Sequence, residues 1–159
     1  MINSLCKKIA EDIAKKFEFY EVDVQDFLKF NMVDDRKVTE TCGVEYLNKL
    51  QEDAIYEVAN YYDTVISIHP KYLMNKKNAA VLRKKSVIVY LQINKPVLEA
   101  YARSLKEKEE KSALLTDAIV IEERDKMMKT TADIVLDFNK LNEKLATKQI
   151  SRELGRLLG

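Results

Sequence analysis

The chain has 159 residues, which fits one domain with a substantial core. Its 27 lysines and arginines nearly balance 26 aspartates and glutamates, so its charge favours neither nucleic acid nor an anionic membrane as a partner. No signal peptide and no apolar run long enough to cross a bilayer are visible, so we expect a cytoplasmic protein.

Residues that usually hold metals or phosphates are scarce. Cys6 and Cys42 are far apart, and we expect both to be free thiols. His69 is the only histidine, so a zinc site is not expected. The three glycines are Gly43, Gly155 and Gly159. The 159 residues therefore contain no glycine-rich phosphate loop of the form GxGxxG or GxxxxGK[ST].

The first third of the chain alternates helical and extended patterns. Apolar residues at helical spacing predict an amphipathic helix over residues 3–16. Residues 17–23 alternate apolar and polar, which predicts a strand, and a short helix is expected from 25 to 30. Residues 32–42 are polar and without period, which predicts a surface loop. A helix is expected from Gly43 to about residue 62.

Residues 86–94 are the central element of the second part. They are almost continuously apolar and β-branched, which is typical of a strand covered on both faces in a parallel sheet. A shorter buried strand at 64–68 and a lysine-rich helix precede it, and Pro96 fits the first turn of the next helix.

The last third begins with a charge run at residues 106–111, expected to be a helix end or a mobile loop. Thr116-Asp117 is expected to start a helix, residues 133–138 a strand, and a last helix closes the chain. Strands alternating with helices predict a three-layer α/β/α sandwich with a parallel sheet of about four strands, in a single domain over residues 1–159.

Six motifs follow one another in an order that chance rarely produces. They are EFYEVD (18–23), GVEYLNKLQE (43–52), VISIHP (65–70), SVIVYL (86–91), KSALL (111–115) and ER…AD (123–133). They are similar to EFYDSD, GEEGFRDREE, VLATGGG, GVVVYL, KRPLL and ERNPLYEEIAD of shikimate kinases. The chain thus resembles the shikimate kinase family of nucleoside-monophosphate-kinase-like P-loop kinases from about Ser4 onward.

The resemblance implies transfer of the ATP γ-phosphate to the 3-hydroxyl of shikimate, with Mg²⁺. It places Asp23 on the aspartate that binds the substrate hydroxyl and Arg124 on an arginine that binds the substrate carboxylate. Glu21 falls on a carboxylate that helps hold magnesium, and Arg103 matches the arginine beside the adenine.

The departures from the family lie in the chemistry. Asn48 replaces the first carboxylate-binding arginine, and Ser112 replaces the arginine of the lid. Ile-His-Pro at residues 68–70 replaces the triple glycine. The family's first strand and GxxGxGK[ST] loop belong just before Leu5, where only residues 1–4 stand, so we expect a shikimate-kinase-like P-loop fold without its first strand.

Each candidate has a purely structural alternative. Asp23 also suits an N-cap for the helix at 25–30, and His69 suits a cap at a strand end better than a catalytic base. Glu21 needs phosphates nearby to share a magnesium ion. Arg124 also suits a surface salt bridge with Glu122, Glu123 or Asp125.

The missing strand bears on the sheet. In the resembled fold it lies between the strands at 64–68 and 86–94, and a gap would leave buried backbone groups unpaired, at about 1–3 kcal/mol each. We therefore expect these two strands to pair directly. The expected order across the sheet is the strand at 17–23, then those at 64–68, 86–94 and 133–138. The alternative is a strand supplied by a protein partner or by a second copy in a homodimer.

We expect a shikimate-kinase-like protein that is degenerate and acts as a non-catalytic small-molecule-binding or regulatory module. The alternative is an active or truncated shikimate kinase, or a kinase of a related small metabolite. No catalytic residue is assigned, and ATP and Mg²⁺ are cofactors only if the family activity is retained. The expected ligand is a small hydroxylated or carboxylate metabolite.

Overall fold

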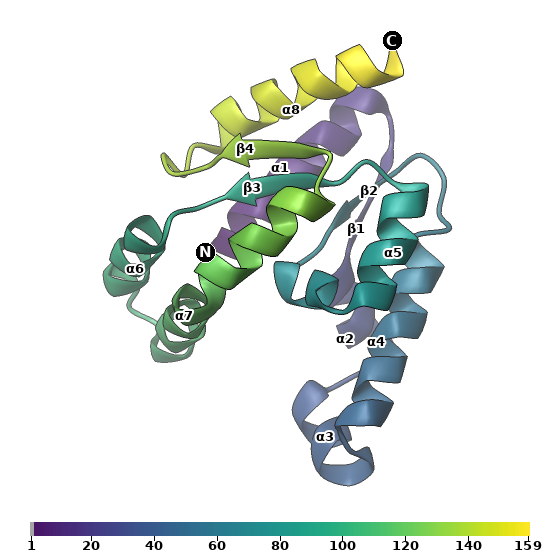
Figure 1. Cartoon of the computed structure of the whole chain (residues 1–159), viewed down its shortest axis with the longest axis vertical. Helices are drawn as coiled ribbons and strands as arrows, with labels where there is room; N and C mark the ends of the chain where they lie inside the picture. The colour runs from purple at the N-terminus through teal and green to yellow at the C-terminus, as the bar shows by residue number, and fades with distance from the viewer. Residues whose placement is uncertain (1) are drawn as a thin grey trace. The chain divides into compact units, whose positions relative to one another are not determined.

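The computed structural model describes residues 2–159, in which helices alternate with short strands (Figure 1). The chain divides into two compact units. Unit 2 is Cys6–Ser86, and unit 1 is Val87–Gly159 together with the first residues up to Leu5. No helix in the described part of the chain is long and apolar enough to span a membrane.

Unit 2 is built on one pair of parallel strands. Its elements are α1 (Ile2–Phe17, which begins in unit 1), β1 (Tyr20–Asp23), α2 (Val24–Phe30), α3 (Asp35–Cys42), α4 (Val44–Val58), β2 (Thr64–Ser67), the 3₁₀ helix η1 (Pro70–Met74) and α5 (Lys76–Lys85). β1 pairs with β2 so that Asp23 lies opposite Ser67. Val24, Ile55 and Val58 are fully buried in its core.

Unit 1 repeats the arrangement with a second pair. Its elements are β3 (Val89–Gln92), α6 (Lys95–Ser104), α7 (Lys108–Thr131), β4 (Ile134–Asp137) and α8 (Glu143–Leu158). β3 and β4 are parallel, with Tyr90 opposite Val135. Pro96 lies in the first turn of α6, as predicted. Phe138 and Met128 are among the most buried side chains of this unit.

The parallel direction of the strands is confirmed, but the expected direct pairing of residues 64–68 with 86–94 is wrong. The strands form two separate two-stranded sheets, β1 with β2 and β3 with β4. All four residues of β2 are only partly buried. Unpaired backbone groups in such partly buried residues cost less than the fully buried groups on which the expectation rested. A strand supplied by a partner stays a prediction.

Both long predicted strands are shorter in the structure. The strand expected at 17–23 covers only Tyr20–Asp23, because α1 continues to Phe17 and Glu18 turns the chain with a φ of 58°. The strand expected at 86–94 covers Val89–Gln92. Ser86 instead closes α5, donating its backbone N–H to Leu82.

The surface loop expected at residues 32–42 is wrong, because most of it is helix α3. Asp34 caps this helix by accepting a hydrogen bond from the Lys37 N–H at 3.1 Å. Arg36 and Glu40 pair along its surface at 3.0 Å, and Gly43 ends it with a φ of 88°. None of its residues is buried, so it carries no apolar stripe for a periodicity argument to detect.

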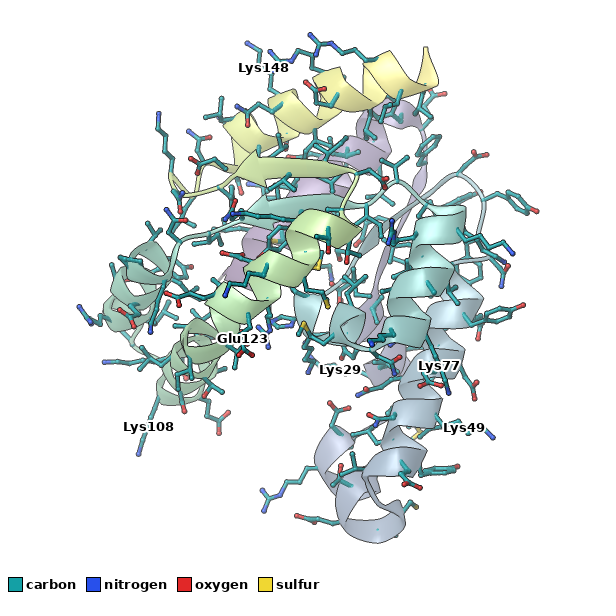
Figure 2. All side chains as sticks on the ribbon, in the orientation of Figure 1. Lys29, Lys49, Lys77, Lys108, Glu123 and Lys148 are labelled. Carbon is teal, nitrogen blue, oxygen red and sulfur yellow. The ribbon has the colours of Figure 1, made fainter. Side chains whose placement is uncertain are left out.

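The break expected between residues 106 and 116 is much shorter than predicted: residues 105–107 separate α6 from α7, and α7 then runs without interruption from Lys108 to Thr131. Glu109 and Glu110 in its first turn favour a helix start there, since acids stabilise the positive end of the helix dipole. Thr116 Oγ1 bonds to the Ser112 carbonyl of its own helix at 2.9 Å instead of capping a new one. The side chain of Lys108 extends away from the helix (Figure 2).

Candidate functional site

The carboxyl ends of β1 and β2 bring Glu21, Asp23 and Ser67 together, and we call these three residues the strand-end cluster. Asp23 lies opposite Ser67 in the ladder, and Glu21 lies two residues earlier, on the same face of β1. Ser67 Oγ donates to Asp23 Oδ2 at 2.6 Å and lies 3.5 Å from Glu21 Oε1. Because a hydroxyl carries one hydrogen, the shorter contact is the hydrogen bond that orients Ser67.

Asp23 also caps a helix, as the sequence suggested. Its Oδ1 accepts the Asp26 N–H at 2.9 Å at the start of α2. The two carboxylate oxygens therefore have separate roles, one toward the backbone of α2 and one toward Ser67. Only the second oxygen is held by a side chain that a ligand hydroxyl can replace.

Glu21 is an acid of the strand-end cluster with a raised pKa. Burial raises its pKa, and the nearby negative charges of Asp23 and Glu11 act in the same direction. Lys7 opposes them, although Lys7 itself forms an ion pair with Asp26. Glu21 therefore keeps its proton to higher pH than an ordinary glutamate.

The metal role predicted for Glu21 stays a prediction. Within residues 2–159 no group of three or more histidine, cysteine, aspartate or glutamate side chains is placed to hold a metal ion. A magnesium ion at Glu21 would take further oxygen ligands from phosphate or water.

His69 follows β2 and caps the 3₁₀ helix η1, so its expected capping role is confirmed. Its Nδ1 accepts the Lys71 N–H at 3.1 Å. Pro70 begins η1 and has no N–H to offer a ligand. In residues 68–70, which replace the family's triple glycine, one ring nitrogen of His69 is therefore hydrogen-bonded to the backbone of η1.

Arg124 lies on α7 in unit 1, and its expected partner is wrong. Its Nη1 donates to Asp117 Oδ1 at 2.8 Å, with the two side chains only 14% and 23% exposed. Residues seven apart lie two turns apart on one helix face, whereas immediate neighbours point in other directions. This geometry explains why the partner is not Glu122, Glu123 or Asp125.

Asp125 belongs instead to a polar network that sequence reasoning missed. The Tyr90 hydroxyl donates to Asp125 Oδ1, and Gln92 Nε2 donates to Oδ2 at 3.3 Å. Burial, and then the hydrogen bond to Asp125, raises the pKa of Tyr90. The network ties α7 to β3. The available signal was the polar ends of Tyr90 and Gln92, two residues apart on one face of an apolar strand.

The remaining predicted residues lie apart from these clusters. Arg103 is 72% exposed on α6, 3.9 Å from Glu99. Asn48 is exposed on α4 and Ser112 is exposed on α7. A cavity of about 160 Å³ in unit 1 contains none of the predicted site residues. It is lined by Asp137, Phe138, Lys140, Asn142, Leu145, Ala146 and Gln149.

The two roles of Asp23 are separable by substitution. Asp23→Ala removes the cap of α2 and should lower the free energy of unfolding by about 1 kcal/mol. Asp23→Asn keeps an oxygen for the Asp26 N–H and should retain most of that stability. Denaturant titration of both variants measures the difference, and equal losses would contradict the capping role.

The raised pKa of Glu21 predicts a pH-dependent stability. The folded state binds this proton more tightly than the unfolded state, so the contribution is complete below the unfolded pKa and is lost as pH rises through the folded pKa. Glu21→Gln should therefore stabilise the protein more near neutral pH than in acid. Denaturant titrations across pH measure this, with exposed Glu122→Gln as the control. If both substitutions change the stability equally at every pH, the pH dependence does not come from the raised pKa of Glu21.

The profile of the family described as shikimate kinase matches residues 7–154. Shikimate kinase from Bacteroides thetaiotaomicron is similar with a TM-score of 0.74 at 18% identity, covering 95% of this chain and 90% of that one. Shikimate kinase from Aquifex aeolicus is similar with a TM-score of 0.72 at 19% identity, covering 100% of this chain and 94% of that one. Shikimate kinase from Acinetobacter baumannii, solved in complex with shikimate, is similar with a TM-score of 0.68 at 11% identity, covering 99% of this chain and 88% of that one. No curated protein sequence matches. The match over residues 7–154 shows that the chain belongs to the shikimate kinase family.

Proposed function

We propose that this protein binds a small hydroxylated carboxylic acid, with shikimate as the first candidate, and that these 159 residues do not transfer phosphate to it. The observation that carries the proposal is the strand-end cluster at the carboxyl ends of two paired parallel strands. This is where α/β proteins bind their ligands. The complex of the Acinetobacter baumannii enzyme with shikimate supports the choice of ligand.

The proposed binding step is an exchange of donors at Asp23. A ligand hydroxyl replaces Ser67 Oγ at Oδ2, while Oδ1 keeps the Asp26 N–H and α2 stays capped. A hydrogen bond to a charged group contributes about 1.5–3 kcal/mol, but the ligand gains only the difference from the Ser67 bond it displaces. Arg124, the other residue assigned by resemblance, lies in unit 1, and its role toward a carboxylate stays a prediction.

Three features support the absence of phosphoryl transfer. Transfer relies on backbone amides, a lysine and a metal ion around the phosphates, and these residues contain no glycine-rich loop to provide the cradle. Pro70 lacks an N–H, and His69 Nδ1 is bound to the backbone of η1. The raised pKa of Glu21 disfavours its charged form, which weakens it as a magnesium ligand.

Titration calorimetry with shikimate and with MgATP, together with a coupled assay of ADP release, tests the proposal. Shikimate should bind, and Asp23→Ala should weaken its binding. MgATP should bind no more tightly than about millimolar, near 4 kcal/mol. Shikimate-dependent ADP release would instead establish an active kinase, which is the alternative function. A micromolar dissociation constant for MgATP would contradict the proposed lack of a nucleotide site.

Asn48 offers a gain-of-function test. It is exposed on α4, next to Lys49, whose side chain projects outward from the helix (Figure 2). Asn48→Arg restores a charge that the family uses for the substrate carboxylate, and should tighten shikimate binding at least roughly tenfold, since a charged hydrogen bond contributes about 1.5–3 kcal/mol. Asn48→Gln is the uncharged control. Unchanged affinity in Asn48→Arg would show that the position has been assigned wrongly.

A further inference from the structure

Lys85, the last residue of α5, is a lysine that neutral groups of unit 2 hold in place. Its ammonium donates a hydrogen bond to Asn60 Oδ1 and lies 5.3 Å from the centre of the Tyr56 ring. Asn60 in turn donates to the Tyr56 carbonyl at 2.8 Å. The ammonium is therefore oriented by an amide and an aromatic ring at the end of α4, and neither of these carries a negative charge.

The end of α5 differs in this respect from other basic positions of unit 2. Carboxylate partners are found for three other lysines: Lys7 with Asp26, Lys71 with Asp35 and Lys77 with Glu52. Lys85 and its exposed neighbours Arg83 and Lys84 form no ion pair within residues 2–159. The carboxyl end of a helix supplies only about half of a negative charge. Most of the positive charge in this last turn is therefore not neutralised by the protein.

Exposed tyrosines adjoin this charge. Tyr56 is 58% exposed, and Tyr61 and Tyr62 follow Asn60 directly in the chain, with Tyr62 89% exposed. We call Tyr56, Tyr61, Tyr62, Lys84 and Lys85 the tyrosine–lysine patch. Exposed tyrosines are typical of protein interfaces, where the ring buries a large area and loses little conformational entropy.

The tyrosine–lysine patch is remote from the strand-end cluster within the same unit. Its residues 61 and 62 precede the amino end of β2, whereas Ser67 lies at the carboxyl end of that strand. The patch can therefore act independently of the function proposed for the strand-end cluster.

We propose that the tyrosine–lysine patch docks an acidic segment of a partner protein. Carboxylates of the segment pair with Lys84 and Lys85, and its apolar side chains cover the rings of Tyr56 and Tyr62. Charge complementarity carries this choice of partner, because the patch presents oriented positive charge that lacks an acid.

A single-stranded nucleic acid fits the same patch less well. Bases stack on open aromatic faces, and one face of Tyr56 is already covered by the Lys85 ammonium. The Tyr61 hydroxyl donates to Glu57 at 3.0 Å, which places a carboxylate beside the second ring. A carboxylate there repels phosphates and weakens a continuous backbone track.

Fluorescence anisotropy with the full chain tests the proposal. The probe is a labelled peptide of alternating glutamate pairs and single leucines, and its control is the same peptide with glutamine in place of every glutamate. The acidic peptide should bind about tenfold more tightly than the control, and its affinity should fall as salt rises, because salt screens exposed charges. Equal affinity for the two peptides, or no binding of the acidic one, would overturn the proposal.

Variants at the two ends of α5 locate the binding. Lys84→Gln combined with Lys85→Gln should weaken binding of the acidic peptide several-fold. Lys76→Gln combined with Lys77→Gln removes the same number of charges from the other end of the helix, where Lys77 is labelled in Figure 2, and should leave binding unchanged. Equal losses in both double variants would show attraction by charge anywhere on the surface and would refute the patch.

Two further measurements separate docking from other roles. Tyr62→Ser should weaken peptide binding several-fold at an unchanged melting temperature, because the ring is almost fully exposed. If the lysines only stabilise the end of α5, their double variant would lower the melting temperature and leave peptide binding unchanged. Tighter binding of a short labelled oligothymidylate than of the acidic peptide would assign the patch to nucleic acid. Either of these last two results would overturn the proposal.

Discussion

The parallel pairing of β1 with β2 is the constraint on which the chemistry of unit 2 depends. Parallel strands end at the same edge of a sheet, so a register that sets Asp23 opposite Ser67 also gathers Glu21 at that edge. The start of α2 directly after Asp23 then assigns one carboxylate oxygen to the backbone. Changing the register by one residue would turn these side chains to the opposite face and dissolve the cluster.

The polar groups that the family resemblance singles out already have partners within the protein. Asp23 is held by Ser67 and by α2, Arg124 by Asp117, and His69 by the backbone of η1. Binding at such groups is an exchange of hydrogen bonds, and its net free energy is the small difference between two similar interactions. Modest changes in the internal partners therefore have a large influence on which ligand is preferred.

Much of the fold follows from local sequence patterns, and the rest depends on contacts that those patterns do not record. Amphipathic helices, the parallel direction of the strands and the caps formed by Asp23 and His69 were predictable from neighbouring residues. The division into two sheets was not, because pairing partners are chosen between distant segments. The partner of Arg124 required knowing that α7 is continuous through Asp117. The sequence suggested that Thr116 and Asp117 start this helix, which assigns them to a cap instead of to an ion pair within the helix.

Helix α3 has a consequence for how this sequence can change over time. Its stability comes from Asp34 at one end, Gly43 at the other and a surface pair between Arg36 and Glu40, with no residue buried. Apart from a long ion pair between Asp35 and Lys71, positions along such a helix are constrained mainly by helix propensity, so they can drift more freely than the core. Divergence among relatives should therefore accumulate in α3 first, and a peptide tag or a fluorescent label placed there would disturb the rest of the protein least.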